Sequence, residues 1–318
     1  MRNHLFLVAA LAVGALVFFL ARSVGNEYVF VAGYVVLQYL VLATAWNILG
    51  GYTGYVNFGT PAFFALGAYS TAALTKLVTL PLPALMVAGG VVSGVIGLAM
   101  GYLTLRLRGV FFSIATLALA VVLKTFITNW SFIGGSKGTY IVRPMTVPLL
   151  GSYSQYLFLL MLLLSIGAIT IARSIERSRL GYGFAAIRDD ETAAEASGVP
   201  TLKLKLIATT LSGALMGMAG APYLYYGAYL NPESAFTLDY AVNSIAMPLI
   251  GGTTSWIGPL IGTLLLGGVQ QWASVSRIFE GYPQVNVLLV GVVLVLFVVA
   301  APNGILGLLR SRRRRSTV

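Results

Sequence analysis

The sequence predicts an all-α protein, a polytopic bundle of transmembrane helices that forms a single domain over residues 1–318. Three observations lead to this prediction. Of the 318 residues, 58% are hydrophobic and only 9% are charged, whereas about a quarter are charged in an ordinary soluble domain. The mean hydropathy is +0.88. Apolar segments recur from Leu5 to Ala301 with only short polar breaks between them, so a water-soluble globule of this length is excluded.

About ten apolar segments are candidates for membrane helices, since roughly 20 apolar residues cross the hydrocarbon core. They cover residues 5–21, 28–49, 56–76, 82–105, 109–128, 154–175, 203–226, 238–251, 257–274 and 284–302. The first could instead be a cleaved secretory signal, but its length favours an uncleaved helix. The eighth is short and contains Pro248, followed by Gly251 and Gly252, which predicts a broken or re-entrant helix.

The basic residues predict the orientation. With the N-terminus placed in the cytoplasm, 14 of the 20 lysines and arginines fall inside and the other six fall outside, as the positive-inside rule requires. Five of the 14 lie in the basic C-terminal tail, residues 310–318. We therefore expect a multi-pass protein of the cell (inner or plasma) membrane with both termini in the cytoplasm. The tail is expected to contact anionic membrane lipid rather than nucleic acid.

The residue types exclude several kinds of chemistry. The sequence has no cysteine and one histidine, His4, so disulfides and thiolate metal sites are impossible and no cofactor is expected. It contains nothing like the G-x-x-x-x-G-K-[ST] loop that binds nucleotide phosphates. The predicted spans also lack the internal Asp, Glu or His that proton- and sodium-driven carriers commonly use. We expect a non-catalytic chain whose energy comes from a separate subunit.

One loop, residues 176–205, is long, charged and helix-prone. Acidic residues alternate there with alanines, and Gly198 and Pro200 supply a stop signal, which predicts a short, solvated helix lying across the membrane face. Ala193 and Ala194 leave a small-residue face that can sit in a groove of another protein. From composition alone, an ordinary connecting loop is the simpler explanation.

Sequence order adds a family resemblance. Residues 186–198 read AIRDDETAAEASG and resemble the EAA loop of ABC importer permeases, in the variant of the branched-chain amino acid (LivM-type) family. Thr192 stands where the general pattern has Glu. Residues 107–117, 130–138 and 251–262 resemble further segments of that family in the same order, and the resemblance extends over about residues 30–309.

This resemblance implies the permease subunit of an ATP-binding cassette importer that translocates branched-chain amino acids or related small polar solutes by alternating access. The loop would be a coupling helix that docks on a separate ATP-binding subunit. Its residues are Arg188, Asp189, Asp190, Glu191, Thr192, Ala193, Ala194, Glu195 and Gly198. The resemblance also implies a second permease subunit, identical or homologous, and an extracytoplasmic solute-binding protein.

Two groups of residues are candidates for the solute route. Gly50, Gly51, Gly54 and Gly59 interrupt the pattern between the second and third segments, and non-helical backbone at membrane depth is tolerated where it is packed in protein or lines a polar cavity. The first group is Asn47, Asn57, Gly59 and Thr60, and the second is Asn243 and Ser244. Close helix packing and hydrogen bonds between helices are alternative explanations for these residues.

The alternative function is an ATP-independent channel or facilitator for small neutral solutes, which needs no docking helix. The sequence leaves open which solute is carried and whether the partner permease is a copy or a paralogue.

Overall fold

The computed structural model describes residues 3–142, 146–147, 151–275, 288, 291–292, 295–296 and 304–307. The longer helices are α1 (Asn3–Ser23), α2 (Glu27–Thr53), α3 (Thr60–Leu77), α4 (Leu82–Thr104), α5 (Val110–Thr128), α6 (Tyr153–Glu176), α7 (Arg179–Asp189), α9 (Thr201–Gly220), α12 (Asp239–Gly251) and α13 (Ile257–Val275). The shorter ones are α8 (Glu191–Ala196), α10 (Tyr223–Gly227) and α11 (Pro232–Ala235). The prediction of a helical protein is confirmed, and nine of the predicted segments coincide with long helices.

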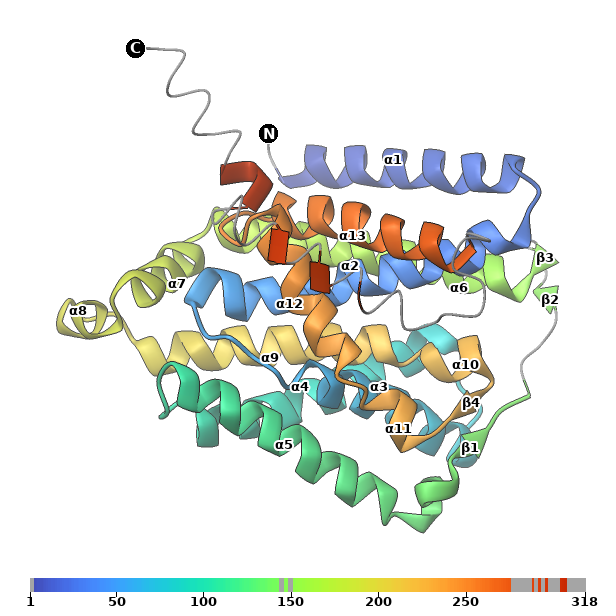
Figure 1. Ribbon diagram of the computed structural model, residues 1–318, viewed down its shortest axis with the longest axis horizontal. Helices are drawn as coiled ribbons and strands as arrows, with labels where there is room; N and C mark the ends of the chain where they lie inside the picture. The colour runs from blue at the N-terminus through green and yellow to red at the C-terminus, as the bar shows by residue number, and fades with distance from the viewer. Residues whose placement is uncertain are drawn as a thin grey trace.

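Helices α2 and α9 form the centre of the bundle (Figure 1). Helix α2 packs against α6, α9, α12 and α13, while α9 packs against α3 and α4. Helix α1 lies on the outside, against α6, where Phe18 contacts the rings of Phe30 and Phe158. Most side chains of α1 are exposed, as expected of a helix that faces lipid.

Six helical stretches are long and apolar enough to cross a membrane: α1, α2, α4, α5, α6 and the stretch 201–227 that joins α9 to α10. Together they make this a multi-pass helical membrane protein. Helix α3 is not among them although its segment was predicted as a span. Two thirds of its residues are buried. Helix α3 therefore contacts mainly protein rather than lipid, and it need not be as apolar as a lipid-facing helix.

Glycine allows α3 to lie directly against α9. A Cβ placed on Gly67 would lie 1.9 Å from the carbonyl oxygen of Gly217, so only glycine fits at this backbone contact. Ser93 of α4 donates a hydrogen bond of 3.0 Å to the carbonyl of Phe63 in α3. Small residues and hydroxyl groups thus hold the three helices together, which is common between membrane helices.

The predicted break between the second and third segments is present, but it begins later than the glycines suggest. Helix α2 continues through Gly50 and Gly51 and ends at Thr53, with Gly54 in the left-handed region at φ 79°. Residues 54–59 are then non-helical until α3 begins at Thr60. Tyr55, Asn57 and Gly59 of this segment are buried while Gly54 and Val56 are exposed, so the segment lies partly inside the helical bundle.

Helix α12 is short and runs unbroken through Pro248, and the helical path is interrupted only after it, at residues 252–256. It has 13 residues and ends at Gly251, followed by the C-cap Gly252, whose φ is 117°. At about 1.5 Å per residue it is too short to cross a hydrocarbon core of roughly 30 Å. Helix α13 returns alongside it, and a Cβ on Gly262 would lie 1.7 Å from the carbonyl oxygen of Met247.

The two ends of the bundle differ. The short helices α7 and α8 and the start of α1 lie at one end, and the paired strands lie at the other (Figure 1). Strand β1 (Thr139–Tyr140) pairs antiparallel with β4 (Tyr229–Leu230), and β2 (Thr146–Val147) pairs with β3 (Gly151–Ser152). Two 3-10 turns, η1 (Ser131–Ile133) and η2 (Gly135–Lys137), precede β1.

Two predictions fall mostly outside the described residues. The tenth segment, 284–302, is described only at residues 288, 291–292 and 295–296, which are helical. The basic tail, 310–318, lies outside them altogether.

Candidate functional site

The predicted coupling helix is two helices, α7 and α8, joined at Asp190. Asp190 has an extended backbone, and its Oδ1 atom accepts hydrogen bonds from the backbone N–H groups of Thr192 (2.9 Å) and Ala193 (3.0 Å). It is therefore the N-cap that begins α8. The helix stops after Ala196, and Gly198 takes φ 83°. Asp190 and Gly198 thus mark the beginning and the end of the α8 segment.

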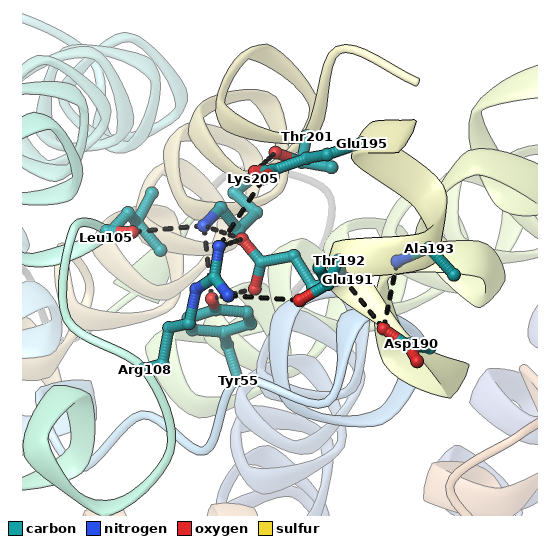
Figure 2. Close-up of polar contacts among 10 residues, drawn as sticks. All are labelled: Tyr55, Leu105, Arg108, Asp190, Glu191, Thr192, Ala193, Glu195, Thr201 and Lys205. Carbon is teal, nitrogen blue, oxygen red and sulfur yellow. Dashed lines mark hydrogen bonds and ion pairs between the residues drawn. The ribbon is translucent and has the colours of Figure 1, made fainter. Parts of the chain in front are cut away.

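Glu191 points from α8 back into the bundle (Figure 2). Its carboxylate lies 2.7 Å from Nζ of Lys205 and 3.9 Å from the guanidinium of Arg108, and it accepts a hydrogen bond from the hydroxyl of Tyr55. Lys205 also donates to the carbonyl of Leu105 at 3.0 Å. The side chains of Glu191 and Lys205 are only 11% and 4% exposed. We call Tyr55, Arg108, Glu191 and Lys205 the α8 attachment.

The partners of Glu191 stabilise its charged form. Burial raises the pKa of a carboxyl, but here the hydrogen bonds from Lys205 and Tyr55 and the positive charges of Lys205 and Arg108 outweigh burial. The pKa of Glu191 is therefore lowered from its ordinary value of 4.5, and Glu191 is ionised at neutral pH.

Other contacts extend the attachment along α8. Arg108 lies 3.5 Å from the carboxylate of Glu195 and donates to the hydroxyl of Thr192 at 3.3 Å. Glu195 also accepts a 2.7 Å hydrogen bond from the hydroxyl of Thr201, at the start of α9. Helix α8 is thereby joined both to α9 and to the connection between α4 and α5.

Tyr55 links the attachment to the non-helical segment 54–59, whose backbone is hydrogen-bonded by neighbouring side chains. Trp46 donates to the carbonyl of Asn57 (2.8 Å), and Ser113 donates to that of Val56 (2.8 Å). The N–H of Phe58 donates to the hydroxyl of Thr116 at 3.1 Å. Buried backbone outside a helix needs such partners, and here they come from α2 and α5.

The expectation of a fully solvated helix is wrong on one face of α8. Ala194 is 5% exposed and packs within this chain, and Glu191 is held in the attachment, so neither is free to enter a groove of another protein. A six-residue helix that lies against the bundle must bury one face. The other predicted coupling residues are exposed: Arg188, Asp189, Asp190, Thr192, Ala193, Glu195 and Gly198. Thr192 and Glu195 also contact Arg108, so we call the other five residues the outward face.

The structure joins the two predicted groups of the solute route. The hydroxyls of Thr60, at the start of α3, and Ser244, in α12, lie 3.1 Å apart, and both residues are fully buried. We call this pair the α3–α12 junction. Next to it, Asn57 accepts a 2.7 Å hydrogen bond from the N–H of Gly59, which shapes the turn into α3.

The two asparagines of the predicted route that lie within helices, Asn47 and Asn243, have different surroundings. Asn47 is buried in α2 and donates to the carbonyl of Ser255 at 3.4 Å. Asn243 instead lines a cavity between α2, α12 and α13. All six predicted residues are buried against other parts of this chain, and Asn243 also borders this cavity.

Sequence reasoning treated Arg108 and Lys205 only as topology determinants and did not single out Tyr55. One signal for Lys205 was available. It falls in the inward stripe of α9, next to Leu204 and in line with Ala208, Thr209 and Ser212, all of which are buried. A lysine in a buried stripe requires an anionic or carbonyl partner.

Comparison with known proteins finds relatives of this chain. Residues 28–298 match a family described as "Branched-chain amino acid transport system / permease component". The chain is 28% identical over 298 residues to the high-affinity branched-chain amino acid transport system permease protein LivM of Salmonella typhimurium, with 86% of this chain and 68% of that protein covered. LivM of Escherichia coli is 27% identical with the same coverage.

A more distant relative is the probable branched-chain amino acid transport permease protein LivH of Methanocaldococcus jannaschii. It is 25% identical over 304 residues, which cover 91% of this chain and 95% of that protein. No solved structure matches the chain.

Proposed function

Because the chain belongs to the branched-chain amino acid transport permease family, we propose that it is the membrane-spanning subunit of an ATP-binding cassette importer. Its solutes are branched-chain amino acids or related small polar molecules. The chain itself performs no chemistry on the solute, and ATP is hydrolysed in a separate partner subunit.

The observation that carries this proposal is the two-sided construction of α8. One side is fixed to the bundle by a buried ion pair of 2.7 Å between Glu191 and Lys205. The other side carries the outward face, where Asp189 and Ala193 are exposed. A loop that merely connects two spans needs no such fixing, whereas a helix that transmits force from a partner does. We infer that the outward face docks on the ATP-binding subunit.

The attachment suggests how motion passes inward. Movement of α8 acts through Glu191 on Tyr55, and so on the segment 54–59 that leads to Thr60. Thr60 in turn contacts Ser244 of the short helix α12. Closure of the ATP-binding subunits would then shift α3 against α12 and open the route to the other side of the membrane, which is alternating access.

The topology we propose has about ten membrane segments, including the short α12, and both termini in the cytoplasm. The distribution of charge supports this orientation. Arg108, Lys205 and the start of α1 lie at the same end of the bundle as α8, and Lys124 pairs with Glu233, at 2.7 Å, near the strands at the other end. The end with α8 therefore faces the cytoplasm.

The proposed assembly contains two permease subunits, identical or homologous, two ATP-binding subunits, an extracytoplasmic solute-binding protein and the surrounding membrane lipid. Reconstitution of this assembly in vesicles separates an importer from a channel. We expect uptake of labelled L-leucine, or of another amino acid in a panel, only with ATP and the binding protein present. Equal flux in the absence of ATP would establish the channel alternative instead.

A further inference from the structure

A cavity of about 360 Å³ lies between α2, α12 and α13. This volume is within the range of roughly 300–1,000 Å³ that is usual for small-molecule sites. Val35 and Val36 of α2 form an apolar wall, while Asn243 of α12 and Gln270 and Gln271 of α13 supply amide groups. The cavity thus combines a surface for an aliphatic group with hydrogen-bonding groups.

The amides are held in place by hydrogen bonds. Gln270 donates to Oδ1 of Asn243 at 2.9 Å, and Asn243 donates to the backbone carbonyl of Asp239 at 2.9 Å. Gln271 accepts a hydrogen bond of 3.2 Å from the hydroxyl of Tyr28 in α2. Such fixing orients the polar wall in advance, which lowers the cost of binding a ligand.

Helix α13 has two different faces. Leu265 and Trp272, which lie seven residues apart on one face, are exposed, as expected of a surface that meets lipid. Gln270 and Gln271 lie on the cavity side. Polar side chains within a membrane helix face the protein interior or a water-filled cavity rather than hydrocarbon. The cavity side of α13 is therefore the side that meets water or a solute.

Asn243 and Ser244 are neighbours in α12 but make different contacts. Ser244 is fully buried and contacts Thr60 in the α3–α12 junction, whereas Asn243 borders the cavity. The same short helix therefore contacts both the element moved by the α8 attachment and the cavity. A shift of α12 would change the shape of the cavity wall.

The charge of the cavity is negative. Asp239 is the one Asp, Glu, Lys, Arg or His among its described lining residues. Asp239 is exposed, and no ion pair joins it to another described residue. An exposed carboxylate that is not ion-paired to any described residue attracts a positively charged group.

We propose that this cavity is a solute-contact site and that Asp239 binds the positively charged group of the solute, with the valines of α2 against its aliphatic part. This inference rests on the proposed function, because it assumes that a solute passes through the chain. It adds the location of the contact and the residue that selects for a cationic group.

Cysteine labelling in the assembled transporter tests the site without relying on uptake. The sequence has no cysteine, so Gln271→Cys introduces a single thiol. We expect a small cationic methanethiosulfonate reagent to modify Gln271→Cys, and L-leucine, delivered with the binding protein, to slow that reaction. The matched control Leu265→Cys lies on the lipid face of the same helix and should react slowly, without protection by leucine.

Asp239→Asn tests the charge. In the Gln271→Cys background, the cationic reagent should react faster than an anionic one of the same size. Asp239→Asn should reduce that ratio several-fold, because loss of the negative charge slows the cationic reagent and speeds the anionic one. Equal rates for the two reagents before the change, or an unaltered ratio after it, would overturn the role of Asp239.

Different results would reject the proposed cavity site and the proposed importer function. An unreactive Gln271→Cys, or a reactive thiol that leucine does not protect, in a complex that still takes up leucine with ATP, overturns the site alone. If the thiol is labelled and leucine protects it, but leucine flux through the complex does not depend on ATP, the site is supported and the importer assignment is rejected.

Discussion

The α8 attachment and the α3–α12 junction hold helices together by opposite means. At the end of the bundle, Glu191 and Lys205 form a buried ion pair of 2.7 Å. Inside the bundle, Thr60 and Ser244 share one neutral hydrogen bond of 3.1 Å. A charge deep in hydrocarbon is expensive, so ion pairs such as this one lie near the ends of the bundle, where water and lipid headgroups are near.

The difference predicts how each region responds to change. Removing one member of a buried ion pair leaves an uncompensated charge, so the attachment should fail abruptly. The interior relies on many weak contacts and on close backbone approach, so it should weaken in steps. A firm attachment at one end and an adjustable junction inside are what a transmitted motion requires.

The largest expected effect comes from Lys205→Met. It leaves the Glu191 carboxylate buried without its main partner, which should cost about 3 kcal/mol and release α8 from the bundle. The matched control is Lys203→Met, since Lys203 is exposed two residues earlier on α9. Protease sensitivity of α8 and the unfolding temperature of the purified chain measure the effect. Similar behaviour of the two variants would show that the attachment contributes little.

Gly67→Ala tests the interior. The new methyl group would lie 1.9 Å from the Gly217 carbonyl oxygen, so α3 and α9 must move apart at a cost of about 2 kcal/mol. Gly268→Ala is the control, because nothing lies within 4 Å of a Cβ there. Loss of folded protein in detergent, measured by size-exclusion chromatography after heating, should appear only in Gly67→Ala. If both tolerate heating equally, backbone approach does not govern the interior.

A smaller effect is expected at the junction itself. Ser244→Ala removes the hydrogen bond to Thr60 and should cost about 1 kcal/mol, the usual net worth of one neutral hydrogen bond. A double-mutant cycle with Thr60→Val measures the coupling between the two hydroxyls from unfolding free energies. A coupling energy near zero would mean that the two side chains are merely adjacent.

The smallest effect should come from pH. The pKa of Glu191 is lowered in the folded chain, so its contribution to stability is complete above the unfolded value of 4.5 and is lost as the pH falls through the lower, folded pKa. Protease sensitivity of α8 should therefore stay constant at neutral pH and rise below pH 4.5. Glu191→Gln should abolish this dependence, and an unchanged acid response in that variant would assign it to another group.

Local patterns in the sequence predicted much of this architecture. Gly198, predicted as a stop signal, follows the end of α8, whereas the N-cap at Asp190, which divides the loop into two helices, was not predicted. The direction of Glu191 could not be predicted, because a six-residue helix gives too little periodicity to identify its buried side. Its partner Tyr55 lies 136 residues earlier.

The contact at the α3–α12 junction could not be predicted from the sequence either. Thr60 and Ser244 were each recognised as polar residues in apolar surroundings, but 184 residues separate them. Only the tertiary fold shows that they touch. Likewise, nothing in the local pattern distinguishes Ser244, which is packed, from its neighbour Asn243, which lines a cavity.

The central claim is that the outward face of α7 and α8 docks on a separate ATP-binding subunit while the opposite face is fixed to the bundle. Ala193 is exposed on α8, and Ala118 is exposed on the lipid-facing side of α5, so Ala193→Trp and Ala118→Trp add the same bulk in two places. Neither should alter the attachment.

Co-purification of the ATP-binding subunit with each tagged variant is the most direct measurement. We predict that Ala118→Trp retains the ATP-binding subunit at the level of the unmodified chain, and that Ala193→Trp loses most of it while remaining folded in the membrane. Full retention of the ATP-binding subunit by Ala193→Trp, with normal ATP-driven uptake, would contradict the account.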